Sequence, residues 1–502
     1  MKQRHVSKLC IIMAMAVVGT ELAASASRAQ PPPPRPEGED GVLVLTRGPV
    51  HEAFAETVAF DPEPGIVVTM APPNPIEEVP PDQRPEGLNV TWIPGYNAWD
   101  DERNDYLWVS GIWRAPPPGR QWVSGYWGGS SQGFQWISGY WGDAQVIETE
   151  YLPEPPETVE IGPGVPAPSL EHSWIPGCWI WHQGRYAWRP GYWVTQYSDW
   201  DWIPGHYTWT PQGYVFIDGY WDYTVERRGV LFAPVYFDTR IYARREYYYS
   251  PATVISLNVF SDHLFVRPRY HHYYFGDYYD ASYTNAGFYS RSEFHTRRHG
   301  YDPIYVHQRW KHRDESDWQV RDDSDFRHRR DHVEARPPRT LSAQRTADTS
   351  GHTSHDGGRV VASSLDELAK SKASAIRFQA VDIGEKQQLV QRGKEVRRFR
   401  EERKKVEAYV ADRSTNEPAK QLAPARLRIP RSPIVAKSSG ELGKDRSPPQ
   451  RHQAPQPDPT VEAKPRKTRG NAEAPRAESG ENRNGGSKEQ SKDKSKRKSK
   501  DD

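Results

Sequence analysis

The stretch Trp122-Val-Ser-Gly125-Tyr-Trp127 is repeated fourteen residues later as Trp136-Ile-Ser-Gly139-Tyr-Trp141. Further copies of this Trp-x-x-Gly-x-Trp motif begin at Trp92, Trp108, Trp174, Trp188, Trp202 and Phe216. The first, seventh and eighth copies are degenerate, because Asn97, Tyr207 and Phe216 replace an indole. Start positions 108 to 136 and 174 to 216 are spaced by 14 residues, and the first step, from 92 to 108, is 16. The motif therefore forms two blocks of four copies.

A period of 14 residues fits one strand and one tight connection, because helix-turn-helix repeats need more than about 20 residues. β-branched and aromatic residues surround the motifs, and these residue types favour strands. Glycine and proline lie between the copies, for example in 116–119, 128–133 and 211–213, as in hairpin connections. Strands joined by short loops run antiparallel. We therefore expect a mainly β fold in which each block is a four-strand meander, followed by further aromatic-rich strands.

The Pro-Gly or Ser-Gly step inside each copy has two interpretations. The two Trp of a copy are five positions apart, so a flat strand would place them on opposite faces. A β-bulge at the glycine would bring both indoles to one face, and the copies with serine favour this reading. Alternatively, Ile-Pro-Gly-x is a type II turn. In either case equivalent Trp on neighbouring strands come into register, and each aromatic pair contributes about 0.2–1 kcal/mol.

These motifs resemble the WXXGXW (YXWGXW) repeat family of exported bacterial proteins. With the runs 41–56 and 227–236, the chain is similar to long members from planctomycete-type bacteria. The resemblance covers residues 41–318. It implies an exported repeat protein, and it implies no catalytic residue.

Composition divides the chain into nine segments. The segments are a signal peptide at 1–29, a Pro/Glu-rich extended segment with short strands at 30–90, repeat block 1 at 91–144, a Pro-rich acidic spacer at 145–172, repeat block 2 at 173–222, a Tyr/His-rich β region at 223–318, a disordered segment at 319–363, a charged helix at 364–412 and a disordered tail at 413–502.

The first residues are typical of a secretory signal. Basic residues within the first eight positions precede an apolar stretch, 9–19, that is too short to span a bilayer. Small residues before Ala26 and Ala29 suit cleavage. We expect export to the periplasm or the cell surface, with no membrane span after cleavage; an uncleaved anchor is the alternative.

The repeats supply a ladder of indoles that we treat as the candidate functional element. An aromatic platform could contact sugar rings or peptides, whereas the competing interpretation, which we favour, is that these indoles form the core of small sheets. The candidate residues are Trp92, Trp108, Trp113, Trp122, Trp127, Trp136, Trp141, Trp174, Trp179, Trp188, Trp193, Trp202 and Trp221.

The sequence contains no catalytic or cofactor-binding constellation. Adjacent acids such as Asp100 and Asp101 do not predict the separated carboxylates of a glycosidase, and no Gly-x-Ser-x-Gly element is present. His295 and His299 are four residues apart, but Arg297 and Arg298 between them would repel a metal ion. We therefore expect no enzyme, cofactor or metal. Once the signal is removed, Cys178 has no partner cysteine and is expected to be a packed thiol.

Charge argues against nucleic acid as the ligand of the repeats. The net charge is +1, and residues 92–221 contain no Lys and only five Arg. Stacked aromatics that bind single strands normally lie in a positively charged groove. Only the lysine-rich end, 488–500, could contact a polyanion, and a solvated tail is the simpler reading.

One segment of the C-terminal third is expected to fold. Ser364-Leu-Asp-Glu367 is a capping-box sequence, and helix formers follow it to Asp412. Its apolar stripe is thin and too irregular for a regular coiled coil. We expect a lone exposed helix that docks on a partner. The combined hypothesis is a non-enzymatic exported protein that binds an envelope polymer or copies of itself, with carbohydrate binding at the surface as the alternative.

Overall fold

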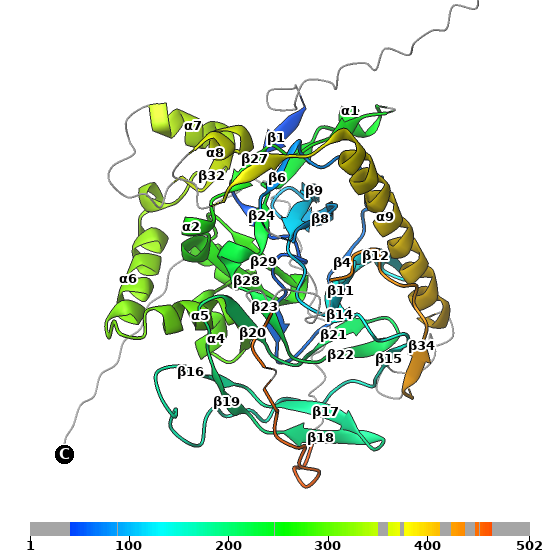
Figure 1. The fold of residues 1–502 in the computed structure, drawn as a ribbon, viewed down its shortest axis with the longest axis vertical. Coiled ribbons are helices and arrows are strands. Elements are labelled where there is room, and N and C mark those ends of the chain that lie inside the picture. The colour runs from blue at the N-terminus through cyan, green and yellow to red at the C-terminus, as the bar shows by residue number, and fades with distance from the viewer. Residues whose placement is uncertain are drawn as a thin grey trace, which may run out of the picture.

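The fold is known from a computed structural model of the 502-residue chain (Figure 1). The structure describes residues 41–87, 89–244, 246–349, 360–371, 376–411, 423–436, 447–450 and 452–463. The predicted signal peptide, the Pro31-Pro-Pro-Pro34 run and the lysine-rich end lie outside the described residues.

The repeat region, residues 91–223, consists of short strands in antiparallel pairs, as expected. Its strands fall into four groups, which we call hairpins 1 to 4 in chain order. Hairpin 1 contains β7 (Thr91–Ile93), β8 (Tyr96–Asp100), β9 (Asp105–Val109) and β10 (Ile112–Arg114); hairpin 2 contains β11 (Arg120–Val123), β12 (Tyr126–Ser130), β13 (Gly133–Ile137) and β14 (Tyr140–Asp143). Hairpin 3 contains β16 (His172–Ile175), β17 (Cys178–His182), β18 (Arg185–Arg189) and β19 (Tyr192–Thr195); hairpin 4 contains β20 (Trp200–Ile203), β21 (His206–Thr210), β22 (Gly213–Ile217) and β23 (Tyr220–Tyr223).

The motif copies pair two by two instead of forming four-strand meanders. In hairpin 2, β12 pairs with β13 across the turn, and β11 pairs with β14 beyond the glycines. Hairpins 1, 3 and 4 have the same order. No strand of one hairpin pairs with a strand of the adjacent hairpin of its block. The mainly β prediction is confirmed, but the predicted connectivity is wrong, because the equal spacing of the copies hides their grouping into pairs.

The glycine step interrupts the ladder on both strands at once. In hairpin 2 the register runs from Val123↔Tyr140 to Tyr126↔Ile137, so two residues on one strand oppose two on the other. A bulge would oppose two residues with one. A type II turn needs positive φ at its glycine, and the motif glycines are not among those with positive φ. The glycine step is therefore neither a β-bulge nor a type II turn, and both predictions were wrong.

Strands from outside the repeats extend the hairpins or pair beside them. Thus β24 lies next to β10, β25 next to β9, and β4 next to β13. These strands are β1 (Val42–Val44), β2 (Gly48–Pro49), β3 (Val58–Ala59), β4 (Val67–Val68), β5 (Glu77–Glu78), β6 (Gln83–Pro85), β15 (Thr149–Tyr151), β24 (Gly229–Leu231), β25 (Val235–Phe237), β26 (Tyr248–Tyr249), β27 (Thr253–Ile255), β28 (Leu264–Arg267), β29 (His272–Phe275), β30 (Tyr289–Ser290), β31 (Gly300–Tyr301), β32 (Ala362–Ser364), β33 (Phe378–Ala380) and β34 (Ala425–Leu427).

Helices are more frequent than the sequence indicated. The region 223–318 mixes strands with short helices, and two helices occupy the described part of 319–363, where composition predicted disorder. Phe326 of the first of these packs against Phe265 and Tyr279, which gives this polar segment an apolar anchor. The helices are α1 (Thr239–Tyr242), α2 (Leu257–Phe260), α3 (Ala281–Asn285), α4 (Arg291–Thr296), α5 (Pro303–Lys311), α6 (Trp318–Asp331), α7 (Leu341–Thr349), α8 (Leu365–Lys370) and α9 (Ile383–Ala411).

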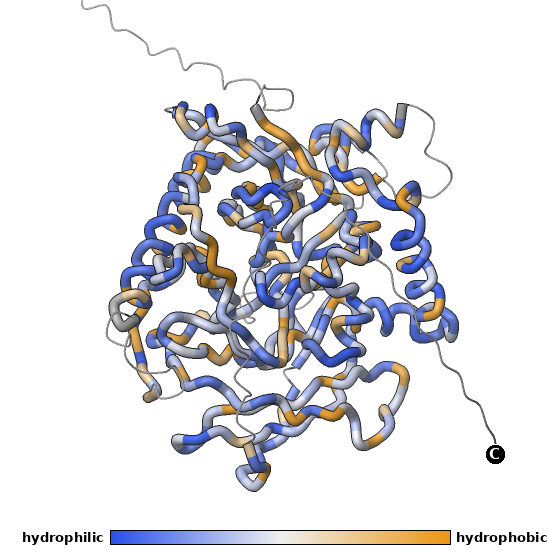
Figure 2. The backbone as a smooth tube through the Cα atoms, turned by 180° about the vertical axis from the view of Figure 1, so that it is seen from behind, coloured by the Kyte–Doolittle hydropathy of each residue, from blue (hydrophilic) through white to orange (hydrophobic). Residues whose placement is uncertain are grey.

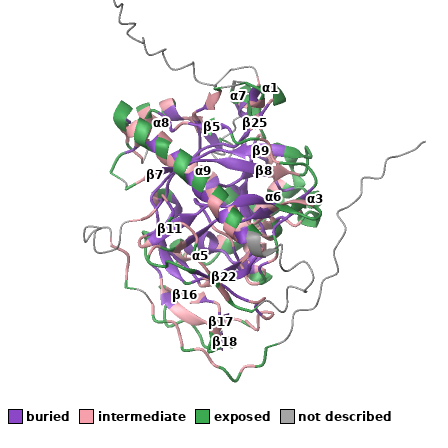
Figure 3. Ribbon diagram, turned by 90° about the vertical axis from the view of Figure 1, so that its right-hand side faces the viewer, coloured by how far each residue is buried: buried purple, intermediate pink, exposed green. Residues whose placement is uncertain are grey.

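The charged helix α9 packs along hairpins 1 and 2 and is not a lone exposed helix (Figures 1 and 3). Leu389, Val396 and Phe399 are buried on its inner face. Arg403 and Glu407 on the same face are also fully buried. The hydrophilic colour of most of α9 in Figure 2 explains why the pattern of hydropathy did not predict this docking.

Pieces of the predicted disordered tail also lie on the repeats. Strand β34 pairs with β15, Val435 bridges to Gln121 of β11, and Asp458 bridges to Trp188 of β18. Ile434 is buried in the main core. Within the described residues, no helix is both long and apolar enough to cross a membrane.

Candidate functional site

Each hairpin brings the first aromatic ring of one motif copy against the second ring of the other copy. The ring centroids of the seven pairs are 5.0–5.4 Å apart in edge-on or tilted orientations, which the ring quadrupoles favour. The pairs are Trp92–Trp113, Trp122–Trp141, Trp127–Trp136, Trp174–Trp193, Trp179–Trp188, Trp202–Trp221 and Tyr207–Phe216.

The motif glycine is required by close packing of an indole. A Cβ atom on Gly139 would lie 2.5 Å from Cζ2 of Trp122, and one on Gly191 would lie 2.3 Å from Cζ2 of Trp174. Real Cβ atoms do not approach other atoms so closely. Packing of the first Trp of one copy therefore requires a glycine at the motif position of the copy with which it pairs.

A carboxylate accepts hydrogen bonds from N–H groups where the Pro-Gly or Ser-Gly step interrupts the strand ladder. Glu52 accepts hydrogen bonds from Trp136 Nε1 and from the Gly139 N–H, both at 2.9 Å. Glu160 accepts from Trp174 Nε1 and from the Gly177 N–H in the same way.

Hairpins 1 and 4 satisfy the same N–H groups with small variations. Glu78 accepts from Trp108 Nε1 and from both glycine N–H groups of hairpin 1, Gly95 and Gly111. In hairpin 4 the motif supplies its own acid, because Asp218 accepts from the Gly219 N–H at 2.9 Å. The Pro/Glu-rich segment and the acidic spacer thus provide hydrogen-bond acceptors that complete the repeats.

Glu52 and Glu78 are buried, and burial is the main influence on their protonation. Burial raises the pKa of Glu52 to about 8, against hydrogen bonds from Gly139 and Trp136 that lower it. Burial likewise raises the pKa of Glu78 to about 7 and that of Glu56, which accepts from Trp141 N and Tyr220 Oη, to about 7.

The carbonyl groups at the gap of hairpin 2 are satisfied by α9. Arg403 donates to the carbonyl oxygens of Ser124 at 2.9 Å and Ser138 at 3.0 Å. Its Nε donates to Glu407 at 2.9 Å, and Glu407 accepts from Tyr126 Oη at 2.7 Å. At the interruption of the ladder in hairpin 2, Glu52 therefore satisfies the Gly139 N–H and Arg403 satisfies the two carbonyl oxygens.

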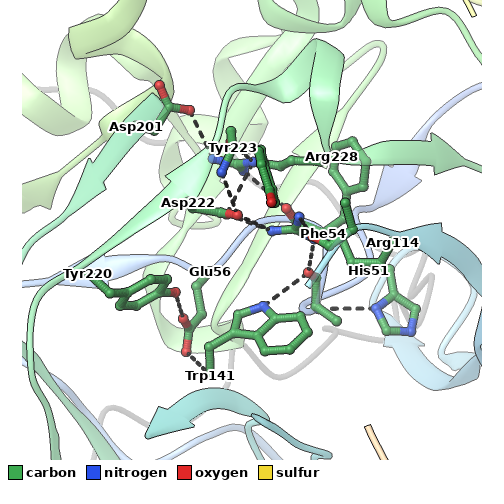
Figure 4. Close-up of polar contacts among 12 residues, drawn as sticks. His51, Phe54, Glu56, Arg114, Trp141, Asp201, Tyr220, Asp222, Tyr223 and Arg228 are labelled. Carbon is green, nitrogen blue, oxygen red and sulfur yellow. Dashed lines mark hydrogen bonds and ion pairs between the residues drawn. The ribbon is translucent and has the colours of Figure 1, made fainter. Parts of the chain in front are cut away.

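A second buried ion network joins hairpins 1 and 4 (Figure 4). Arg114 at the end of β10 donates to both oxygens of Asp222 on β23, at 2.7 and 2.6 Å. Arg228 donates to Asp201 on β20 at 3.0 Å and to the Phe54 carbonyl. Since Arg114 also donates to the Ala53 carbonyl, the segment before β3 is fixed between the two hairpins.

The stretches that match a known family model correspond to the paired motif copies. Residues 87–114, 172–194 and 198–222 match the model described as WXXGXW repeat (2 copies). The chain therefore contains WXXGXW repeats. Each matched stretch coincides with one hairpin, so the two copies of the model correspond to the two halves of the hairpin. Hairpin 2 lies outside the matched stretches but has the same geometry. Comparisons with curated proteins and with solved structures found no match.

The WXXGXW hairpins bury most of the predicted platform. Eleven of the thirteen candidate Trp are buried, and Trp174 and Trp193 of hairpin 3 are half-buried. The rings thus serve mainly as core, and the carboxylates and Arg403 that hold them were missed by sequence reasoning. Glu52 and Gly139 are 87 residues apart, and the composition of the Pro/Glu-rich segment was the only signal for its role.

Hairpin 3 is the part of the repeat array with the most exposed aromatic surface (Figure 3). Trp181, Tyr186 and Tyr192 are also half-buried. The spacer beside them carries exposed aliphatic side chains, with Ile161 79 % and Leu170 66 % exposed. Hairpin 3 also lies at one end of the molecule (Figure 1).

The histidines of the Tyr/His-rich region make separate contacts. His263 bonds to Tyr279, His272 to Tyr96, and His307 lies 3.0 Å from Asp201. His295 stacks near Tyr305, and His299 near Tyr289. In the part of the chain that the structure describes, no group of three or more His, Cys, Asp or Glu is arranged to hold a metal ion. Cys178 is half-buried with its Sγ 3.2 Å from Arg189 Nη2.

Proposed function

We propose that this protein is an exported, non-enzymatic repeat protein with a structural role in the cell envelope, and that it contacts an envelope polymer through hairpin 3. The observation that carries the proposal is the difference between hairpins. Hairpins 1, 2 and 4 bury every paired indole, and only Phe216 among their paired rings is half-buried, whereas both Trp174 and Trp193 of hairpin 3 are half-buried.

The buried polar groups support a structural role. Glu52, Glu78 and Glu160 hold glycine and indole N–H groups, and Arg114 and Arg228 hold two hairpins together. Groups committed to such contacts are not free for acid–base work. Export is supported by the N-terminal sequence.

Carbohydrate binding is the second candidate, and the same surface favours it. Half-exposed indoles offer flat apolar faces to sugar rings, and the exposed aliphatic residues of the spacer widen that surface. Nucleic acid fits hairpin 3 less well, because Glu148, Glu150, Glu154, Glu157 and Glu160 lie in the spacer next to it.

The test of the binding surface is co-sedimentation of the purified protein with insoluble cell-envelope polysaccharide. Trp174→Ala combined with Trp193→Ala should abolish retention, since it removes the half-exposed rings. Trp99→Ala is the matched control, because Trp99 is a half-buried Trp of hairpin 1. Equal retention of both variants would refute the role of hairpin 3.

The test of export is cell fractionation followed by N-terminal sequencing. We expect protein outside the cytoplasm that begins after Ala26 or Ala29. Cytoplasmic protein that retains Met1 would refute export.

A further inference from the structure

A cleft lies between the last turns of α9 and the segment that follows β34. It has a volume of about 480 Å³ and is lined by Glu402, Lys405, Val406, Arg428, Ile429, Pro430 and Arg431. Residues 402, 405 and 406 share one face of the helix because they are three and four positions apart. Val406, Ile429 and Pro430 give the cleft an apolar floor.

The rim of this cleft is positively charged. Lys405, Arg428 and Arg431 are exposed, and Glu402 is the one acid of the lining. Across the described ranges, none of these three cations forms an ion pair within 4 Å, whereas Arg426 pairs with Glu150 at 3.1 Å. The cleft therefore presents cations that the described chain does not neutralise.

Carboxylates pair with arginines elsewhere in the chain, from helices in some pairs and from extended segments or turns in others. Arg267 pairs with Asp101 and Arg47 with Glu102, both acids at the tip of hairpin 1. Arg426 receives Glu150 from the neighbouring extended strand β15. In all three cases the anion is a carboxylate on an extended segment or turn of polypeptide.

We propose that this cleft binds an extended acidic peptide segment of a partner protein. Arg428 and Arg431 both line the cleft and are three residues apart, so their Cα atoms are at most roughly 10 Å apart at about 3.3 Å per residue. Two carboxylates of an extended peptide can span that separation. The apolar floor contacts the side chains between them. None of the described lining residues is aromatic, so none can stack on a sugar ring, and the floor of valine, isoleucine and proline suits a peptide better than a phosphate polymer.

Binding of a fluorescein-labelled dodecamer of glutamate to the full-length protein, measured by anisotropy, tests the proposal. Arg428→Glu with Arg431→Glu should weaken binding at least about tenfold, through loss and reversal of two charge contacts. Arg428→Lys with Arg431→Lys keeps the charge and should retain most of the affinity. Arg185→Glu with Arg244→Glu changes the net charge equally at exposed sites away from the cleft and should have little effect.

The other outcomes would overturn the proposal. These are no binding of the peptide, equal loss in the control variant, or stronger competition per charge by inorganic polyphosphate or polygalacturonate than by unlabelled peptide. Circular dichroism confirms that each variant is folded. This proposal does not depend on hairpin 3, so loss of polysaccharide retention and loss of peptide binding are separate results.

Discussion

At the scale of single residues, the motif is a unit of ring, glycine and carboxylate. The first aromatic residue covers the glycine of the partner copy, and in hairpins 1 to 3 at least one such glycine N–H donates to an acid from elsewhere in the chain. Glycine is needed here for space, because its φ is not in the positive range.

Gly139→Ala should therefore destabilise the protein by about 1–3 kcal/mol, the usual cost of forcing an extra methyl into a packed site. Its Cβ would lie 2.5 Å from Trp122. Gly129→Ala is the matched control, because nothing lies within 4 Å of a Cβ there. Urea denaturation measures both variants. Equal stability of the two would show that the indole does not require the glycine.

The buried acids predict how stability depends on pH. The pKa of Glu52 is raised from 4.5 to about 8 in the folded protein, and those of Glu56 and Glu78 to about 7. A carboxyl whose pKa is raised on folding stabilises the protein below the unfolded pKa, and this contribution is lost as pH rises through the folded pKa. Buried histidines whose pKa is lowered, such as His51 and His272, have the opposite effect below their unfolded pKa of 6.5. The free energy of unfolding should therefore fall from pH 7 to pH 8, by up to about 1.4 kcal/mol per pH unit for each carboxyl.

Glu52→Gln removes one of these groups and should make the dependence shallower. The slope of the free energy of unfolding against pH is the readout, because loss of the hydrogen-bond acceptor lowers stability at every pH. Urea midpoints at four pH values between 7 and 8 measure it. A free energy of unfolding that rises across this window would contradict the account.

At the scale of elements, the sequence predicted strands but not their grouping. Trp, Val, Ile and Tyr around each glycine specify short strands, and the spacing of 14 residues specifies their repetition. Nothing in the spacing distinguishes the turn at Gly128–Gly133, which closes hairpin 2, from the connection at Pro116–Gly119, which leads to it. Grouping depends on which indole meets which glycine, and that is a property of packing.

Helix α9 shows a second limit of sequence reasoning. Its inner face carries Arg403 and Glu407, which a hydropathy pattern assigns to solvent. They are buried because the gap in hairpin 2 offers two carbonyl oxygens and because Tyr126 and Tyr151 donate to Glu407.

Arg403→Met should destabilise the protein by about 3–5 kcal/mol, because it leaves Glu407 buried without its cation. The same change at exposed Arg398 should have little effect. The double variant Arg403→Met, Glu407→Gln should lose less than Arg403→Met alone, since no buried charge remains unpaired. Thermal and urea denaturation compare the three variants. An Arg403→Met variant as stable as the Arg398→Met control would show that Arg403 does not anchor α9.

At the scale of the whole molecule, four hairpins are held by segments distant in sequence. Residues 41–87 and the spacer supply acids, α9 supplies Arg403, and the C-terminal pieces add backbone pairs at Gln121 and Trp188. The Arg114–Asp222 pair connects the two blocks, and Arg228, just before β24, pairs with Asp201 of hairpin 4. Composition predicted extended or disordered chain for much of this material, since it contains few apolar residues. The repeats provide the hydrogen-bonding partners that order it.

The arrangement leaves hairpin 3 with the most aromatic surface exposed. That follows from its place at one end of the molecule, where Glu160 and the bridge to Asp458 cover it only in part. The fold thus separates a buried set of rings from a small accessible set, which is the basis of the proposed binding role.

The most direct test of the pairing is a double-mutant cycle on the free energy of unfolding. Trp122→Leu and Trp141→Leu, whose rings lie 5.2 Å apart in hairpin 2, should couple by about 0.5–1.5 kcal/mol. Trp113→Leu and Trp122→Leu, which a continuous meander would place on neighbouring strands, should add to within about 0.5 kcal/mol. Coupling between Trp113 and Trp122 with additivity between Trp122 and Trp141 would contradict the assignment of motif copies to hairpins.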